Sequence, residues 1–468
     1  MKHFRFLCLV AVLLCSGGAA TARAADLPWR VGVATRTLTP PGPIWLAGYA
    51  NRTAPSNGVA LDLHGKALAL DDGAGGRLVI VTLDLIGVPA ALRAHTEKAA
   101  AAKFGLKPHE LLLNASHTHS GPQVSPDRMM LERAFRQNAK PADLAAVEAF
   151  ETFLREAVLD LIGESLQTAA PARLEFGTAR AGFAMNRRRP EANGTITNNP
   201  YPAGPVDHEV PVLKITGVDG KPRALLFGYA CHNTTLGGSQ ISGDYAGHAQ
   251  KFLEASYPGA TALFLMGCAG DQNPYPRGAM VPGQSPDDLA SQHGRALANA
   301  VVTALATRSR TLMPPLRSAY GHAQLDYTPL DGTALARYRT PEHTPPVLER
   351  ARALQDSLRR GDRPAPLACP VQVVQFGGDL TLVALGGEPV IDYALRLKRE
   401  LTGPAAVWVA GYSNDYFGYL GSKRVIAEGG YEGGEANTRI LNHPGPFAPD
   451  AEDRVVAKVH ELLAARRR

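Results

Sequence analysis

The chain has 468 residues, of which 45% are hydrophobic and 20% charged, a composition typical of a folded globular protein with a sizeable core. Its formal net charge of +6 becomes +3 when the three basic residues of the expected leader, residues 1–24, are removed. A charge this weak and scattered excludes nucleic acid as the expected partner.

The first 24 residues have the three parts of a secretory signal peptide. A positive region comes first, an apolar run over residues 6–14 follows, and Ala22-Arg23-Ala24 is a small-x-small cleavage site. The apolar run is too short to span a bilayer, and no other segment has roughly 18 uninterrupted apolar residues. We therefore expect a mature chain of residues 25–468 that is secreted or periplasmic.

Three segments show the same order of strand, helix and strand: residues 78–114, 224–268 and 380–410. In each segment a near-continuous apolar run is followed by a helical spacing and then by a second apolar run. The expected helices lie near residues 89–104, 244–256 and 389–401. Continuous apolar runs are typical of strands covered on both faces, so we expect one large α/β domain with a mixed or parallel sheet. Polar clusters follow the strands, at the edge where ligands of open α/β sheets collect.

The densest polar cluster is Asn114-Ala115-Ser116-His117-Thr118-His119-Ser120-Gly121-Pro122, directly after the first unit. The i, i+2 spacing of His117 and His119 places both rings on one face of an extended segment, about 6 to 7 Å apart. One ring could then bind a metal ion while the other acts on substrate or water. Joint ligation of one ion would be awkward at this spacing.

Three stretches between and after the units are interpreted as loops. Residues 186–207 are rich in Asn, Pro, Arg and Gly and are expected to form a long polar loop at the border of a cleft. Residues 328–368 are proline-rich and are interpreted as a surface insertion with a helix around 346–359. Residues 418–434 are interpreted as a glycine-rich loop.

His232 and Glu388 end strands in the second and third units. A lone histidine at a strand end is more commonly structural, but the position of His232 matches that of the His117 region. Glu388 would cost several kcal/mol if buried without compensation. The alternative is that Glu388 is a favourable charge at the start of the following helix. Two histidines and a carboxylate form a common catalytic zinc set, and the residues alone leave an amide, ester or phosphate substrate open.

The sequence resembles the catalytic domain of the neutral (non-lysosomal) ceramidases, which are zinc amidases that split ceramide into sphingosine and a fatty acid. The resemblance covers most of the mature chain, from residues 31–34 and 46–50 to the tyrosine-rich segment 412–433. The run His117-Thr118-His119-Ser120-Gly121-Pro122 matches the most specific motif of that family.

The resemblance implies one zinc ion per chain and a role for seven residues. The implied zinc ligands are His117, His232, Glu388 and Tyr419. His119 is implied as the general base and acid, and Arg187 and Tyr431 as the groups that stabilise the oxyanion. Without the resemblance, Tyr419 would be interpreted as a packed loop aromatic, and Arg187-Arg188-Arg189 as a solvated basic run.

Two features depart from the family pattern. Asn273 stands where the ceramidases have serine before a proline, and the chain ends too soon after Tyr431 for their immunoglobulin-like C-terminal domain. We expect a zinc-dependent hydrolase of a linear amide, ceramide or a related N-acyl lipid, with transient contact to a membrane surface and no protein partner. The alternatives are a zinc hydrolase of another small amide or ester, such as an N-acyl amino acid or a peptidoglycan-derived fragment, and a secreted binding protein of the same fold without turnover.

Overall fold

The computed structural model describes residues 27–124, 133–328, 330, 335–336, 345–439 and 443–465. The expected signal peptide lies outside these residues. Within them, no helix is both long enough and apolar enough to cross a membrane.

The largest sheet has the strand order β10-β9-β8-β5-β1-β2-β3-β4, with β12 paired to β5. Its two outermost pairs, β3 with β4 and β9 with β10, are parallel, and the pairs between them are antiparallel. The sheet is therefore mixed, as predicted. Its strands are β1 (Trp29–Thr37), β2 (His64–Asp71), β3 (Arg77–Leu83), β4 (Leu111–Ala115), β5 (Ala170–Arg180), β8 (Glu209–Gly217), β9 (Pro222–Tyr229), β10 (Thr261–Met266) and β12 (Arg310–Leu312).

A second sheet has the order β13-β14-β15-β17 and packs face to face on the first. Its strands are β13 (Leu316–Leu325), β14 (Leu367–Phe376), β15 (Leu380–Leu385) and β17 (Ala406–Ala410). Two small sheets complete the described strands: β6 (Ala184–Pro190) with β7 (Ile196–Tyr201) and β11 (Gln272–Pro274), and β16 (Glu388–Pro389) with β18 (Tyr419–Leu420).

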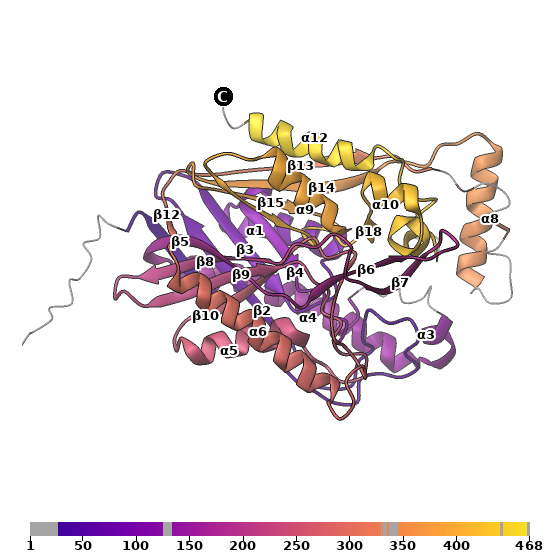
Figure 1. Ribbon diagram of the computed structural model, residues 1–468, viewed down its shortest axis with the longest axis horizontal. Coiled ribbons are helices and arrows are strands. Elements are labelled where there is room, and N and C mark those ends of the chain that lie inside the picture. The colour runs from indigo at the N-terminus through magenta and orange to yellow at the C-terminus, as the bar shows by residue number, and fades with distance from the viewer. Residues whose placement is uncertain are drawn as a thin grey trace, which may run out of the picture.

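Helices cover the outer face of each sheet, so the core has the layers helix, sheet, sheet and helix (Figure 1). Two pairs, α1 with α4 and α5 with α6, lie on the first sheet, while α9 and α12 lie on the second. The described helices are α1 (Ala90–Phe104), α3 (Arg133–Asn138), α4 (Pro141–Gln167), α5 (Asp244–Ser256), α6 (Pro286–Ala306), α8 (Pro345–Arg359), α9 (Ile391–Glu400), α10 (Lys423–Glu428), α11 (Ala436–Thr438) and α12 (Ala451–Ala464), with a 3-10 turn at Pro108–Glu110 and a π-helical turn at Tyr431–Glu435.

The layering explains the continuous apolar runs from which the units were predicted. In β3, Val79 and Val81 pack under α1 and α4, while Leu78 and Ile80 pack against the second sheet. Because both faces of the strand are buried, residues 78–81 are all apolar and the period-2 alternation disappears. The three strand–helix–strand units are confirmed as β3-α1-β4, β9-α5-β10 and β15-α9-β17, each with its two strands parallel.

Two of the loop predictions were wrong. Residues 186–207 contain most of the β6–β7 hairpin, and residues 418–434 contain β18, α10 and most of the π-helical turn. These elements are seven residues long or shorter, so none of them is long enough to show a clear periodic pattern in the sequence. The helix expected around 346–359 is confirmed as α8, although parts of the insertion 328–368 lie outside the described residues.

The side chain of Asn114, at the end of β4, joins the ends of three strands. Its Oδ1 accepts a hydrogen bond from Met266 N of β10 (2.9 Å). Its Nδ2 donates to Gly411 O (2.7 Å) and to Ser413 Oγ (3.1 Å), directly after β17. Asn114 is fully buried, so its amide replaces water for polar groups of all three strands.

We expect Asn114→Leu to lower the free energy of unfolding by about 2 kcal/mol or more, because buried Met266 N loses its partner while Gly411 O and Ser413 Oγ keep only each other. Urea denaturation measures this loss. The control is Asn299→Leu on the exposed face of α6, for which we expect a change within about 0.5 kcal/mol. Equal midpoints for the two variants would contradict the role of Asn114.

Candidate metal centre

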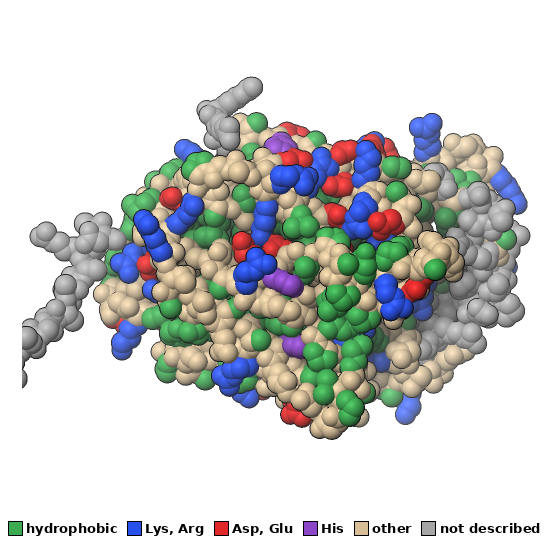
Figure 2. Space-filling view, in the orientation of Figure 1, with side chains coloured by type: hydrophobic (Ala, Val, Ile, Leu, Met, Phe, Trp, Pro, Cys, Tyr) green, Lys and Arg blue, Asp and Glu red, His purple; other side chains and the backbone are tan. Residues whose placement is uncertain are grey.

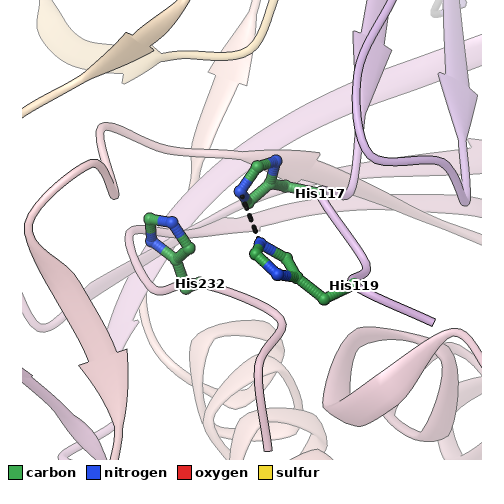
Figure 3. A group of neighbouring side chains, drawn as sticks. All are labelled: His117, His119 and His232. Carbon is green, nitrogen blue, oxygen red and sulfur yellow. Dashed lines mark hydrogen bonds between the residues drawn. The ribbon is translucent and has the colours of Figure 1, made fainter. Parts of the chain in front are cut away.

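The chain after β4 lies beside the chain after β9, and this pairing forms the site. Thr118 makes a parallel bridge with Asn233, and the Asn233 side chain donates to the carbonyl of Ser116. Thr118 Oγ1 also donates to Ser242 O (2.7 Å). These contacts hold His232 next to the two histidines that follow β4 (Figure 3).

His117 and His119 are much closer together than their spacing predicted. Their Nε2 atoms are 3.0 Å apart and their ring centroids 4.7 Å apart. The expectation of an extended segment was wrong because His117 has a φ of 60°, in the left-handed region. The segment turns at His117, so the two rings point toward each other (Figure 3).

Backbone carbonyls determine the protonation of two of the histidines. His117 Nδ1 lies 2.6 Å from Ile86 O, and His232 Nδ1 lies 2.7 Å from Ala269 O. A carbonyl can only accept, so each Nδ1 carries the proton and each Nε2 carries a lone pair. A hydrogen bond from Nδ1 to a carbonyl also orients the ring of a histidine that binds metal through Nε2.

Both lone-pair nitrogens face the carboxylate of Glu388. Glu388 Oε2 is 3.3 Å from His117 Nε2 and 3.4 Å from His232 Nε2, and it has no hydrogen-bond partner among the described residues. Burial, followed by Arg187, lowers the pKa of His232 to about 3, so this ring is neutral near pH 7. Two imidazole nitrogens and one carboxylate oxygen thus converge, a donor set that a divalent cation would bind.

Tyr419 lies at the same centre through strand pairing. Glu388 of β16 and Tyr419 of β18 are register partners in a parallel pair. The Tyr419 hydroxyl is 3.5 Å from His232 Nε2 and accepts a hydrogen bond from Arg187 Nη2 (3.0 Å). The structure therefore brings all four predicted ligands together. The ligand atoms of His117, His119 and His232 also lie within 4.8 Å of one another, which makes His119 a competing ligand.

The arginines of β6 are not a solvated run. Arg187 and Arg188 are buried, and only Arg189 is exposed. Burial alone would lower the pKa of Arg187, but Tyr419 and Glu432 raise it well above its usual value. The Tyr431 ring lies edge-on to that of Tyr419, at 5.3 Å between centroids, and is itself 38% exposed. Arg187 and Tyr431 thus lie on one side of the centre.

The ring of His119 is held by the segment between β1 and β2. Gly48 has a φ of 96°, and a Cβ at this position would lie 2.5 Å from His119 Cγ and Nδ1. The Tyr49 ring packs on His119 at 4.9 Å between centroids, and Arg52 donates to the His119 carbonyl (2.8 Å). His119 Nδ1 is buried without a hydrogen-bond partner among the described residues, so no carbonyl determines its tautomer.

Asp271 was not predicted as a site residue, although it follows β10 at the edge where the other polar clusters lie. Its Oδ1 accepts from Ile391 N at the start of α9 (2.9 Å), and its Oδ2 accepts from Asn186 Nδ2 (2.8 Å). Asp271 therefore provides the acidic group at this helix start. Glu388 precedes the helix and faces the histidines, so the interpretation of Glu388 as a helix-start charge was wrong.

Comparison with known proteins supports the predicted resemblance. The family described as neutral/alkaline non-lysosomal ceramidase, N-terminal, matches residues 29–302. The neutral ceramidase of Pseudomonas aeruginosa is 24% identical over 485 residues, which cover 88% of this chain and 70% of that protein. Neutral ceramidase B of Dictyostelium discoideum is 25% identical over 267 residues, which cover 52% of this chain and 35% of that protein.

The fold is also similar to that of a solved structure. The crystal structure of the neutral ceramidase from Pseudomonas aeruginosa aligns with a TM-score of 0.72 at 19% identity, over 94% of this chain and 75% of that chain. A ceramidase complexed with C2 aligns with a TM-score of 0.68, also at 19% identity, over 93% of this chain and 76% of that chain. At this identity the likeness establishes the mixed α/β fold alone.

We expect Gly48→Ala to displace the His119 ring and to lower turnover at this site by about 10- to 100-fold, because a shift of about 1 Å in a reacting group has effects of this size. Steady-state kinetics measures the loss, and metal analysis should show unchanged metal content. Gly75→Ala is the control, since Gly75 has a similar φ of 104° but has no atom near its Cβ position. Equal losses in both variants would mean that backbone strain alone is responsible.

Proposed function

The chain belongs to the neutral/alkaline non-lysosomal ceramidase family, and we propose that it is a zinc-dependent hydrolase of a linear amide, either ceramide or a related N-acyl lipid. The observation that carries the proposal is the meeting of the His117 and His232 lone pairs with the Glu388 carboxylate. All three groups are buried. The names of the relatives supply the substrate class.

His117, His232, Glu388 and Tyr419 would hold one zinc ion. Imidazole nitrogens with carboxylate and phenol oxygens form a donor set that suits zinc. When bound, the ion supplies Lewis acidity and makes water a nucleophile near neutral pH. The carbonyls of Ile86 and Ala269 keep both Nε2 lone pairs directed at the ion.

His119 would carry the proton. Burial, together with His117 and His232, holds the pKa of His119 well below its usual range, so the ring is neutral and can accept a proton. Its Nε2 faces the centre, while its Nδ1 has no carbonyl partner that would determine the tautomer. His119 would take the proton from the attacking water at Nε2 and return it to the nitrogen of the leaving amine.

Arg187 and Tyr431 would stabilise the oxyanion that forms when water adds to the amide carbonyl. The charged guanidinium of Arg187 lies beside the Tyr419 oxygen, and the half-exposed Tyr431 ring lies on the same side. A preorganised cation and a hydroxyl donor are the groups that such a charge requires. The Tyr431 hydroxyl would donate directly, and Arg187 would contribute its charge through Tyr419.

Export of the chain belongs to this proposal. Residues 1–24 have the charge and hydrophobicity pattern of a signal peptide, which would leave residues 25–468 as a secreted or periplasmic hydrolase domain. A lipid amide would reach the site from a membrane surface or a micelle during transient contact.

We expect wild-type protein to bind about one zinc per chain. His117→Ala should lose both the metal and the activity, because a ligand has been removed. His119→Ala should keep the metal and lose about 10²- to 10⁴-fold in kcat, because only proton transfer is impaired. Metal analysis and kinetics on both variants make this test, with His95→Ala on the exposed face of α1 as the control. Loss of zinc in His119→Ala would contradict the proposed ligand set and favour the three-histidine site.

A substrate panel tests the amide class. We expect zinc-loaded protein to hydrolyse short-chain ceramide faster than N-acyl amino acids, as measured by release of the free amine. The reverse order would support the alternative of another small amide. A zinc-loaded protein that is inert on a broad panel of amides and esters would contradict the enzymatic proposal and support a binding protein.

A further inference from the structure

The segment that carries Tyr431 is rich in glycine, so local backbone preference constrains it only weakly. It forms a π-helical turn over Tyr431–Glu435, which follows Gly429-Gly430 and contains Gly433-Gly434. Gly429, Gly430 and Gly434 have φ values of 71°, 74° and 139°, which glycine adopts at little cost and which leave the chain free to move. A side chain must therefore hold the turn in place.

Glu432 is the side chain that joins this turn to β6. It is 3% exposed, and its two oxygens bind two consecutive arginines. Oε1 accepts from Arg187 Nε (2.7 Å), and Oε2 accepts from Arg188 Nη1 (2.7 Å). Arg188 Nη2 also donates to Gly429 O (2.9 Å) and to Glu428 Oε2 (3.0 Å), so the start of the turn is bound to the same strand.

The charges of this cluster depend on one another. Arg187 and Arg188 are both buried, and among the described residues Glu432 is the one carboxylate with an ion pair to both of them. Removing a partner from a buried ion pair leaves an uncompensated charge, which is strongly unfavourable. The arginines therefore confine Glu432 to one position, and the backbone of Tyr431 is confined with it.

We propose that Glu432 is a positioning residue, which acts on the reaction by holding Tyr431 against Tyr419 at the edge of the metal centre. The inference rests on the proposed function, because it assumes that the Tyr431 hydroxyl serves the reaction. Glu432 is joined to the proposed ligand Tyr419 through Arg187, which binds both side chains. Its ion pairs with Arg187 and Arg188 fix the turn, and the turn fixes the ring.

Hydrogen exchange tests the positioning independently of activity. The amides of Gly433 and Glu435 both donate to Gly430 O, at 3.1 and 3.3 Å, so their exchange reports on the turn. We expect Glu432→Gln to raise exchange over residues 429–438 by about tenfold, because the neutral amide binds the arginines more weakly. Glu435→Gln, an exposed change in the same turn, is the matched control and should leave exchange unchanged.

Kinetics tests the effect on the reaction. We expect Glu432→Gln to lower kcat by about 30- to 100-fold, with KM within about threefold and zinc content unchanged. In a Tyr431→Phe background, Glu432→Gln should lower kcat by less than about threefold, because the hydroxyl that Glu432 positions is already absent. Equal fold losses in the two backgrounds would mean that Glu432 acts through Arg187 or only on the fold, not through Tyr431, and would overturn the inference.

A second variant serves if Glu432→Gln does not fold. Arg188→Lys keeps the positive charge but removes the planar guanidinium that binds several acceptors at once. We expect it to raise hydrogen exchange over residues 429–438 and to lower kcat by about 5- to 20-fold when Tyr431 is present, but not in the Tyr431→Phe background. Unchanged exchange in whichever variant folds overturns the inference and leaves the proposed function intact. A wild-type protein that turns over no amide overturns the proposed function, and with it the effect on catalysis.

Discussion

The hydrogen bonds of the Asn114 amide are the constraint on which the rest of the site depends. Asn114 joins the ends of β4, β10 and β17, which belong to three different strand–helix–strand units and lie in two different sheets. His117, His232 and Glu388 follow strands of these units within three residues, and Tyr419 is paired with Glu388. Ligand atoms must lie within a few tenths of an ångström of their places to bind a metal ion. A shift of one strand end would therefore move a ligand out of range.

Each proposed ligand is held by a group that contributes nothing to the reaction. Backbone carbonyls orient His117 and His232, pairing of β16 with β18 aligns Glu388 with Tyr419, and Asp271 caps the helix that follows Glu388. The supports are backbone groups or fully buried side chains, which have few alternative conformations. The site is thus preorganised by the fold, as a centre that concentrates negative charge and lone pairs requires.

Much of the fold was predictable, because a strand that is buried on both faces of its sheet appears in the sequence as a continuous run of apolar residues. The units β3-α1-β4, β9-α5-β10 and β15-α9-β17 were predicted in this way. The β6–β7 hairpin was missed, since a short hairpin with many polar side chains has the composition of a loop. The distance between His117 and His119 was mispredicted because a left-handed residue leaves no periodic signal. Arg188 was taken for a solvated residue, since its partner Glu432 is 244 positions away.

The sequence by itself determined the strand–helix–strand units, the polar clusters at their ends and, through a family motif, the seven candidate residues of the site. These depend on local periodicity or on short identical runs, which need no knowledge of distant contacts. Only the tertiary structure decided that two histidines meet one carboxylate, that Asn114 joins three strands, and that Glu432 pairs with two buried arginines. These contacts depend on which distant segments become neighbours in the fold. Each contributes to stability because its polar or charged groups are buried and would be costly without a partner.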